Sequence, residues 1–251
     1  MQCLGNSRLF LVGALLQMGF AVALKFLFHE LHLENAVTQL VLLVLGGTST
    51  ALWGCVVAIK SHKARNGWAI ISDFFHLKAG VRYYLFIAGI LLLLFGASIV
   101  SGHFAPNVVW YSFFIFFAQA LLFGGIEEIG WRYTFQPGLE TVLPFAVSCL
   151  VTFICWGTWH YMYFYITDVV ANVSHLGFLM GLLVNCFVLG ALYRCTQNLW
   201  LCVFFHSCVN ALSQIYQAAS LAYTLPVALL CIGLSLWVVY AHTIRSRDRS
   251  L

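Results

Sequence analysis

The sequence predicts an all-α polytopic membrane protein, a bundle of about eight transmembrane helices. Of its 251 residues, 62% are hydrophobic and only 8% are charged, whereas soluble domains are about one quarter charged. Too few polar groups are present to cover a water-exposed surface, so the bilayer is the expected solvent. The net charge of +4 is small and scattered along the chain, which argues against a nucleic-acid partner.

Apolar runs long enough to cross a membrane recur along the whole chain. A helix needs about 20 apolar residues for one crossing, and short polar stretches separate eight such runs. The predicted spans are residues 9–28, 36–59, 83–100, 109–134, 143–166, 176–194, 198–221 and 225–244.

The basic residues predict the orientation of these spans. With eight crossings, ten of the twelve Lys and Arg residues fall on one side, which the positive-inside rule makes cytoplasmic. Lys25 is the exception in the opposite loops, near the outer end of the first span. Both termini are therefore expected in the cytoplasm. The ten residues are Arg8, Lys60, Lys63, Arg65, Lys78, Arg82, Arg194, Arg245, Arg247 and Arg249.

The chain divides by these patterns into three parts. Residues 1–108 hold the N-terminal helices and a basic cytoplasmic loop at 60–82, which could lie in the interface as an amphipathic helix. Residues 109–221 form the core that carries the intramembrane polar groups, and residues 222–251 form the last helix and a basic tail.

A signal peptide is an alternative for the N-terminus, because Arg8 precedes an apolar run with small residues at 21–23. The run continues past Lys25 to full spanning length, which favours a membrane helix.

Two adjacent carboxylates stand inside the fourth predicted span. A charge within the bilayer costs about 2.5–3.5 kcal/mol, so each needs a partner or a purpose. Glu128 and Arg132 are four residues apart on one helix face and can form an ion pair that serves as structural support. Glu127 lies about 100° around the helix. We expect Glu127 to remain available as a general base.

Two histidines and an amide complete the intramembrane set. His160 lies in the fifth predicted span, and His206 and Asn210 are four residues apart in the seventh. An imidazole and an amide on one helix face can both donate to a single oxyanion. Glu127, His160, His206 and Asn210 are the candidate catalytic residues for hydrolysis of an amide bond.

Three motifs in this order resemble those of the CAAX-protease-like (CPBP) intramembrane peptidases. Residues 127–132 resemble the EExxxR motif, 156–160 the FxxxH motif and 206–210 the HxxxN motif, and together they cover about residues 110–215. Trp156 replaces the usual Phe of the second motif and is expected to keep its supporting role in packing.

The resemblance implies an eight-helix fold whose intramembrane catalytic cavity opens toward the cytosolic leaflet, with Glu127 activating water. Tyr133 stands where a Gly often follows the Arg of the first motif, which is expected to alter the turn toward Pro137. The short chain resembles bacterial members, so the expected location is a bacterial cell membrane. Such members are linked to peptide maturation and bacteriocin self-immunity. The expected partner is then a membrane-embedded peptide or lipidated protein substrate.

The depths of two candidates conflict if every span is straight. Glu127 would lie about 12 Å from the surface that follows its span, and His160 about 25 Å from the same surface. We therefore expect residues 137–147 to form a tilted or interfacial segment. A separation of Glu127 and His160 above about 8 Å, beyond one bridging water, would contradict a shared site.

Other chemistries and functions stay open at this point. No metal or other cofactor is the favoured interpretation, but Glu127, His160 and His206 match the ligand count of a catalytic zinc site. A non-catalytic membrane scaffold that binds a membrane partner is the alternative function. A proton-coupled transporter is less favoured, because the sequence lacks an evident inverted repeat.

Overall fold

We describe the protein from a computed structural model, which covers the backbone of residues 2–217 and 219–248. Within these residues every regular element is a helix, apart from an isolated antiparallel bridge between Phe104 and Tyr216. The elements are α1 (Gln2–Glu30), α2 (Ala36–Gly47), α3 (Ser49–Lys60), α4 (Gly67–Phe74), α5 (Val81–Ser101), α6 (Ser112–Ala120), η1 (Leu121–Gly125), α7 (Glu127–Gly130), η2 (Trp131–Phe135), α8 (Gln136–Leu139), α9 (Phe145–Ile166), η3 (Val170–Asn172), α10 (His175–Thr196), α11 (Leu199–Ile215) and α12 (Leu221–Asp248).

Seven helices among the described residues are long and apolar enough to cross a membrane. The chain is therefore an integral membrane protein with a polytopic all-α fold, as the sequence predicts. The seven are Leu4–Glu30, Ala36–Lys60, Val81–Ser101, Ser112–Leu139, Phe145–Ile166, His175–Thr196 and Leu221–Ser246.

The seventh predicted span, residues 198–221, is shorter in the structure. Its helix, α11, ends at Ile215 after 17 residues. The chain then becomes extended and bonds to the loop after α5, where Ala105 N donates to Ile215 O at 2.8 Å and Gln217 N donates to His103 O at 3.0 Å. These backbone bonds replace the last helical turn, which hydrophobicity alone could not reveal.

The basic loop at 60–82 contains α4 and does not form one long interfacial helix. α4 has eight residues, and the chain passes within it from one compact unit to another. The first unit comprises residues 1–71 and 126–179, and the second comprises residues 72–125 and 180–251. The predicted core 109–221 thus contributes to both units.

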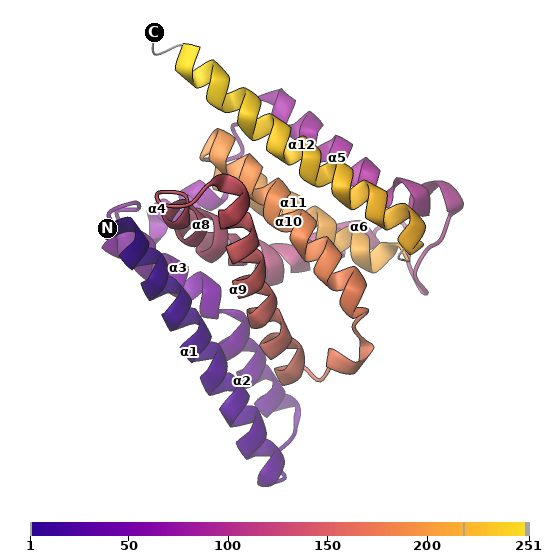
Figure 1. Ribbon diagram of the computed structural model, residues 1–251. Helices are drawn as coiled ribbons and strands as arrows, with labels where there is room; N and C mark the ends of the chain where they lie inside the picture. The colour runs from indigo at the N-terminus through magenta and orange to yellow at the C-terminus, as the bar shows by residue number, and fades with distance from the viewer. Residues whose placement is uncertain (1, 218, 249–251) are drawn as a thin grey trace. The chain divides into compact units, whose positions relative to one another are not determined.

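In the first unit α1 packs against α2, α3 and α9, and α3 packs against α7. Figure 1 shows α1 and α2 lying side by side in indigo and violet, with α9 next to them. The predicted second span is divided into α2 and α3 at Thr48. α3, the second part of this span, covers the short helix that carries the two adjacent carboxylates.

Two glycines allow the helices of the first unit to approach closely. A methyl group on Gly54 would lie 2.7 Å from the backbone N of Gly130 in α7. One on Gly130 would lie 2.5 Å from the Phe10 ring and 2.6 Å from the carbonyl oxygen of Thr50. Small residues at such crossings let backbones touch, which is how helices associate tightly in lipid.

Gly130→Ala is expected to destabilise the protein by about 1–3 kcal/mol, because the added methyl group meets a backbone carbonyl that cannot move aside. Denaturation in detergent micelles measures the change. Gly89→Ala in α5 is the matched control, since a methyl group there meets no atom within 4 Å. Equal stability of the Gly130→Ala and Gly89→Ala proteins would contradict this account of the packing.

The fourth membrane helix is longer than predicted. It runs from Ser112 to Leu139 instead of ending at residue 134. Pro137 is tolerated because it lies in the first turn of α8, where its missing N–H costs little. The buried Gln136 donates to Glu140 Oε1 at 2.9 Å and to Cys149 Sγ at 3.5 Å, so its amide nitrogen is satisfied within the helix bundle.

This extension corrects the expectation of a tilted or interfacial segment at residues 137–147. That stretch begins as helix up to Leu139, and α9 starts at Phe145. Counted from the intervening turn, Glu127 is twelve residues away, about 18 Å, and His160 is fifteen residues away, about 22 Å. The two groups reach similar depths because the fourth helix is longer, not because the fifth starts late.

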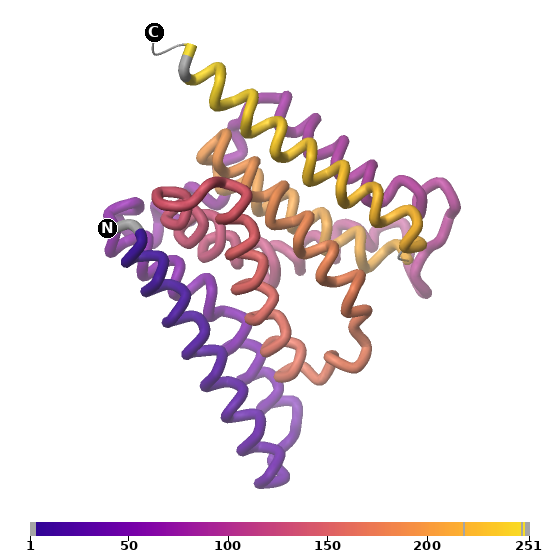
Figure 2. The backbone as a smooth tube through the Cα atoms, in the orientation of Figure 1, coloured from indigo at the N-terminus to yellow at the C-terminus, as the bar shows by residue number. Residues whose placement is uncertain are grey.

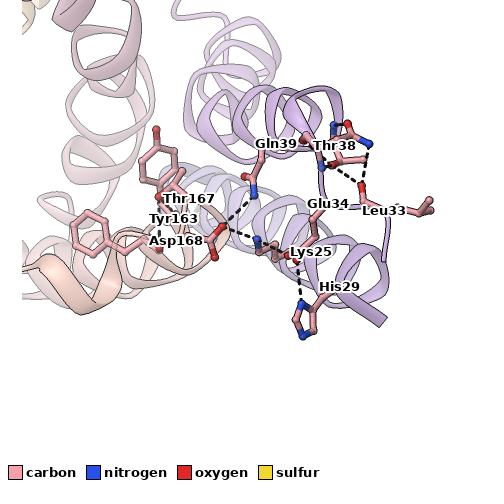
Figure 3. A network of polar contacts seen from close by, with 11 residues as sticks. Lys25, His29, Leu33, Glu34, Thr38, Gln39, Tyr163, Thr167 and Asp168 are labelled. Atoms are coloured by element: carbon pink, nitrogen blue, oxygen red, sulfur yellow. Dashed lines mark hydrogen bonds and ion pairs between the residues drawn. The ribbon is translucent and has the colours of Figure 1, made fainter. Parts of the chain in front are cut away.

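Lys25, which stands apart from the other basic residues in the sequence, is neutralised at one end of the first unit. Lys25 is buried, and its Nζ donates to Asp168 Oδ2 at 2.6 Å and to Glu34 Oε1 at 3.1 Å. Figure 3 shows these carboxylates converging on Lys25, with Gln39 donating to Asp168 and His29 bonded to Glu34. The network ties the loop after α1 to the end of α9, and no net positive charge is left at this end.

The pKa of the Glu34 carboxyl is held below its ordinary value by the hydrogen bonds from Lys25 and His29. A carboxyl with a depressed folded-state pKa contributes stability above its unfolded pKa, and that contribution is lost as the pH falls through the folded value. The Glu34 contribution is therefore present at neutral pH and disappears in acid.

Acidification from about pH 6 to about pH 3 is expected to destabilise the wild-type protein more than Glu34→Gln, which lacks the titrating carboxyl. Thermal unfolding in detergent at each pH measures the difference. Glu30→Gln is the control, since Glu30 is exposed at the same end of α1 and forms no ion pair among the described residues. A pH dependence identical in wild type and Glu34→Gln would contradict the expectation.

In the second unit α11 is the central helix. It packs against α5, α6 and η1, while α12 packs against α5. Figure 2 shows α12 in yellow running beside α5 in violet along most of their length. Asn198 caps α11 by accepting from Leu201 N at 3.1 Å, and its amide donates to the backbone oxygens of His76 and Lys78. This cap fixes where α11 begins and hence the level of the polar residues along it.

Candidate active site

The adjacent carboxylates stand on a single α-helical turn between two π-helical segments. α7 comprises Glu127–Gly130, with η1 before it and η2 after it. π-segments inside α-helices change the direction of the side chains that follow and occur often at functional sites. Both Glu127 and Glu128 are buried. The sequence spacing did not predict these two segments.

The ion pair predicted from spacing is present. Arg132 Nη1 lies 3.4 Å from Glu128, and both side chains are fully buried. The Arg132 guanidinium also stacks over the Trp156 ring at 4.2 Å. Arg132 therefore joins the first motif to α9, which agrees with a supporting role for this pair.

Glu127 has a partner that its place on the helix did not predict. Trp156 Nε1 donates to Glu127 Oε2 at 2.7 Å. The indole thus binds one carboxylate through its N–H and contacts the guanidinium paired to the other carboxylate through its face. A Phe at residue 156 would keep the ring contact with Arg132 but would lack the donor. Trp156 consequently orients Glu127 as well as filling space.

His160 lies one turn beyond Trp156 on α9 and is held by it. His160 Nδ1 is 2.9 Å from the carbonyl oxygen of Trp156, a bond in which the ring nitrogen is the donor. Because Nδ1 carries the proton in this bond, Nε2 is the acceptor nitrogen of the neutral ring. The His160 ring also contacts Trp156 at 5.2 Å, Trp159 at 5.0 Å and Phe178 at 5.2 Å. An aromatic shell therefore limits the orientations of this imidazole.

His206 and Asn210 lie on α11 in the second unit, against the π-segment η1. A methyl group on Gly124 would meet the Asn210 amide nitrogen and would lie 3.4 Å from His206 Nε2. Both polar ends are therefore directed to the same glycine, which agrees with the prediction that they share one helix face. Gly124 was missed by the sequence analysis, because the close contact depends on how η1 meets α11.

The structure thus describes the candidate residues in two groups. Glu127, Glu128, Arg132, Trp156 and His160 belong to the first unit, and His206 and Asn210 belong to the second. A site formed by Glu127, His160, His206 and Asn210 together stays a prediction, as does the zinc alternative. Within the described residues no group of three His, Cys, Asp or Glu side chains is arranged to hold a metal.

Comparison with known proteins identifies the part of the chain that carries these groups. Residues 108–212 match the family described as type II CAAX prenyl endopeptidase Rce1-like. The matched segment contains all three motifs and ends two residues after Asn210. This segment is similar to the CAAX-protease family. Curated protein sequences gave no match to the chain.

The matched family consists of endopeptidases, which are hydrolases. The match covers about two fifths of the chain. Helices α1 and α3, which precede the matched segment, pack against η2 in the first unit, and α3 also packs against α7. The family segment therefore depends on preceding helices for the packing around its carboxylates.

Trp156→Phe is expected to lower the turnover number about tenfold or more while leaving the protein folded. It removes a hydrogen bond to a charged group, worth about 1.5–3 kcal/mol, and keeps the ring that contacts Arg132. Trp159→Phe is the matched control, because Trp159 Nε1 donates at 2.8 Å to Ser49 Oγ and not to a carboxylate. Peptide cleavage and thermal unfolding of both proteins are compared. Equal turnover in the two variants would exclude an orienting role for Trp156.

Proposed function

We propose that this protein is an intramembrane endopeptidase in which Glu127 and His160 activate a water molecule for attack on a peptide bond. The observation that carries the proposal is the connection from Glu127 through Trp156 to His160, with a buried contact of 2.7 Å and a part-buried one of 2.9 Å. It holds a carboxylate and an imidazole in defined orientations, which general base catalysis requires.

The proposed reaction accounts for each proton and bond. Glu127 accepts a proton from water while the water oxygen forms a bond to the peptide carbonyl carbon. His206 and Asn210 donate hydrogen bonds to the resulting oxyanion. The C–N bond then breaks as the proton taken from water passes to the leaving amine, with His160 assisting its transfer. A new carboxylic acid and a new amine are the products, and the acid's proton then passes to the amine to give carboxylate and ammonium.

The side chains of the proposed site suit a substrate that is presented from the membrane. Glu127 and His206 are buried, and both belong to helices within the apolar part of the chain. We propose a small membrane-associated peptide or lipidated tail as substrate, cleaved near the cytosolic face. Maturation of a peptide or self-immunity to a bacteriocin in a bacterial cell membrane is the corresponding biological role.

We propose that both termini lie in the cytoplasm, and the distribution of charge in the first unit supports this for the N-terminus. At one end of the first unit Lys63 Nζ donates to Tyr133 O at 2.6 Å and Ser7 Oγ donates to Phe135 O at 3.0 Å. Arg8 lies beside Ser7 in the sequence, so it shares this end with Lys63. The other end holds the neutralised Lys25. Such asymmetry is what the positive-inside rule associates with a cytoplasmic face.

Glu127→Gln, His160→Ala and His206→Ala are each expected to lower cleavage by at least about a hundredfold, and Asn210→Ala by about 10²–10³. The measurement is hydrolysis of a fluorogenic peptide with a lipid anchor by purified protein in liposomes. His175→Ala is the control for His160, since His175 belongs to the same unit and bonds to Tyr161 at an exposed position.

Glu128→Gln separates support from chemistry in the same assay. It leaves Arg132 buried without its countercharge, so it is expected to reduce stability by about 3–5 kcal/mol. Full activity of the Glu127→Gln and His206→Ala proteins would favour the scaffold alternative. Loss of wild-type activity on chelation, restored by zinc alone, would overturn the metal-free form of the mechanism.

A further inference from the structure

A cavity of about 470 Å³ opens at one end of the second unit and has no part in the proposed reaction. It lies where α5 begins and where α10 and α12 end. Its lining includes Arg82, Tyr83, Cys195, Trp237, His242 and Arg245. Among the described residues that line it, Arg82 and Arg245 are cationic and none is acidic, so the described lining is positively charged.

The cations of this cavity are placed by specific contacts. Arg82 Nη2 donates to Tyr83 Oη at 3.0 Å, and the guanidinium lies over the Tyr83 ring at 4.7 Å. Tyr83 Oη in turn donates to the carbonyl oxygen of Cys195 at 3.3 Å, which links α5 to α10. On α12, His242 and Arg245 are three residues apart and lie on neighbouring positions of one helix face. Cations from two different helices therefore border one opening.

The deeper wall of the cavity is apolar. Phe86 lies four residues after Arg82 on α5 and lines the cavity one turn further into the span. Val238 and Ala241 line it one turn before His242 and Arg245 on α12. The lining therefore changes from cationic at the helix ends to aliphatic and aromatic toward the membrane interior.

Trp237 places this cavity at the boundary between membrane and water. Its side chain is 64% exposed although it belongs to a membrane helix. Exposed Trp residues of membrane proteins gather at the level of the lipid headgroups, where the ring is partly apolar and its N–H meets water. The cavity thus opens where a lipid headgroup and the upper part of its acyl chains would lie.

We propose that this cavity binds an anionic phospholipid, with the phosphate between Arg82 and Arg245 and the acyl chains against Phe86 and Val238. A zwitterionic lipid also brings a positive group toward the same cations, so its binding is weaker. A free phosphate satisfies the arginines but leaves the apolar wall empty. Anionic lipids are also abundant in the cytoplasmic leaflet of membranes, and they attract polybasic protein surfaces.

The test uses the full-length protein, purified in a non-ionic detergent and titrated with phosphatidylglycerol or phosphatidylcholine of equal chain length. Native mass spectrometry measures the lipid that remains bound. Wild type is expected to retain phosphatidylglycerol preferentially. Arg82→Gln/Arg245→Gln is expected to weaken that binding about fivefold for each arginine, since one cation near a membrane surface contributes about 1 kcal/mol.

Lys60→Gln/Arg65→Gln is the matched control, because it removes two exposed cations from the basic loop and leaves the cavity intact. This control is expected to bind phosphatidylglycerol like wild type. Arg245→Gln alone serves if the double variant of the cavity folds poorly, as Arg245 is exposed near the end of α12. Its expected effect is about fivefold.

Three results would overturn the proposal. Equal retention of the two lipids by wild type would show that the cavity does not select an anionic headgroup. Equal losses in the cavity variant and the loop variant would indicate a general charge effect. Displacement of phosphatidylglycerol by inorganic phosphate at similar concentrations would identify free phosphate as the ligand. Binding is measured without peptide cleavage, so these results are independent of the proposed protease mechanism.

Discussion

Two adjacent carboxylates inside a membrane helix need two separate partners, and this requirement governs the packing of the first unit. Arg132 can reach Glu128 because four residues separate them, but it cannot serve Glu127 equally well on the same helix. The donor for Glu127 must then come from another helix. Trp156 of α9 provides it and at the same time covers Arg132 with its ring. α9 is thereby fixed against α7 in both distance and rotation.

Close packing of α1 and α3 against α7 also supports this arrangement. Gly54 and Gly130 bring α3 to the backbone of α7, and Phe10 of α1 packs against Gly130. A larger side chain at either glycine would separate the helices and admit lipid toward the buried charges. Since an unmatched charge in hydrocarbon is costly, the glycines contribute to the electrostatics of the motif as well as to its packing.

The two ends of the first unit surround their basic residues with different partners. Lys25 is surrounded by carboxylates at one end, whereas Lys63 at the other end bonds to a backbone oxygen. In the second unit, Arg82 and Arg245 border one cavity, and none of the described residues in its lining is acidic. These basic groups connect the topology of the chain to the lipids we expect around it.

The sequence by itself determined the features that depend on spacing along one helix. It predicted an all-helical membrane protein, the i, i+4 ion pair of Glu128 and Arg132, and the common face of His206 and Asn210, because the geometry of a helix fixes these relations locally. The tertiary structure decided the contacts between helices. Trp156 as donor to Glu127 and Gly124 against Asn210 depend on how segments distant in sequence pack. The early end of α11 at Ile215 could not be predicted from the sequence either. Hydrophobicity does not reveal the backbone bonds to the loop after α5 that replace the last turn of this helix.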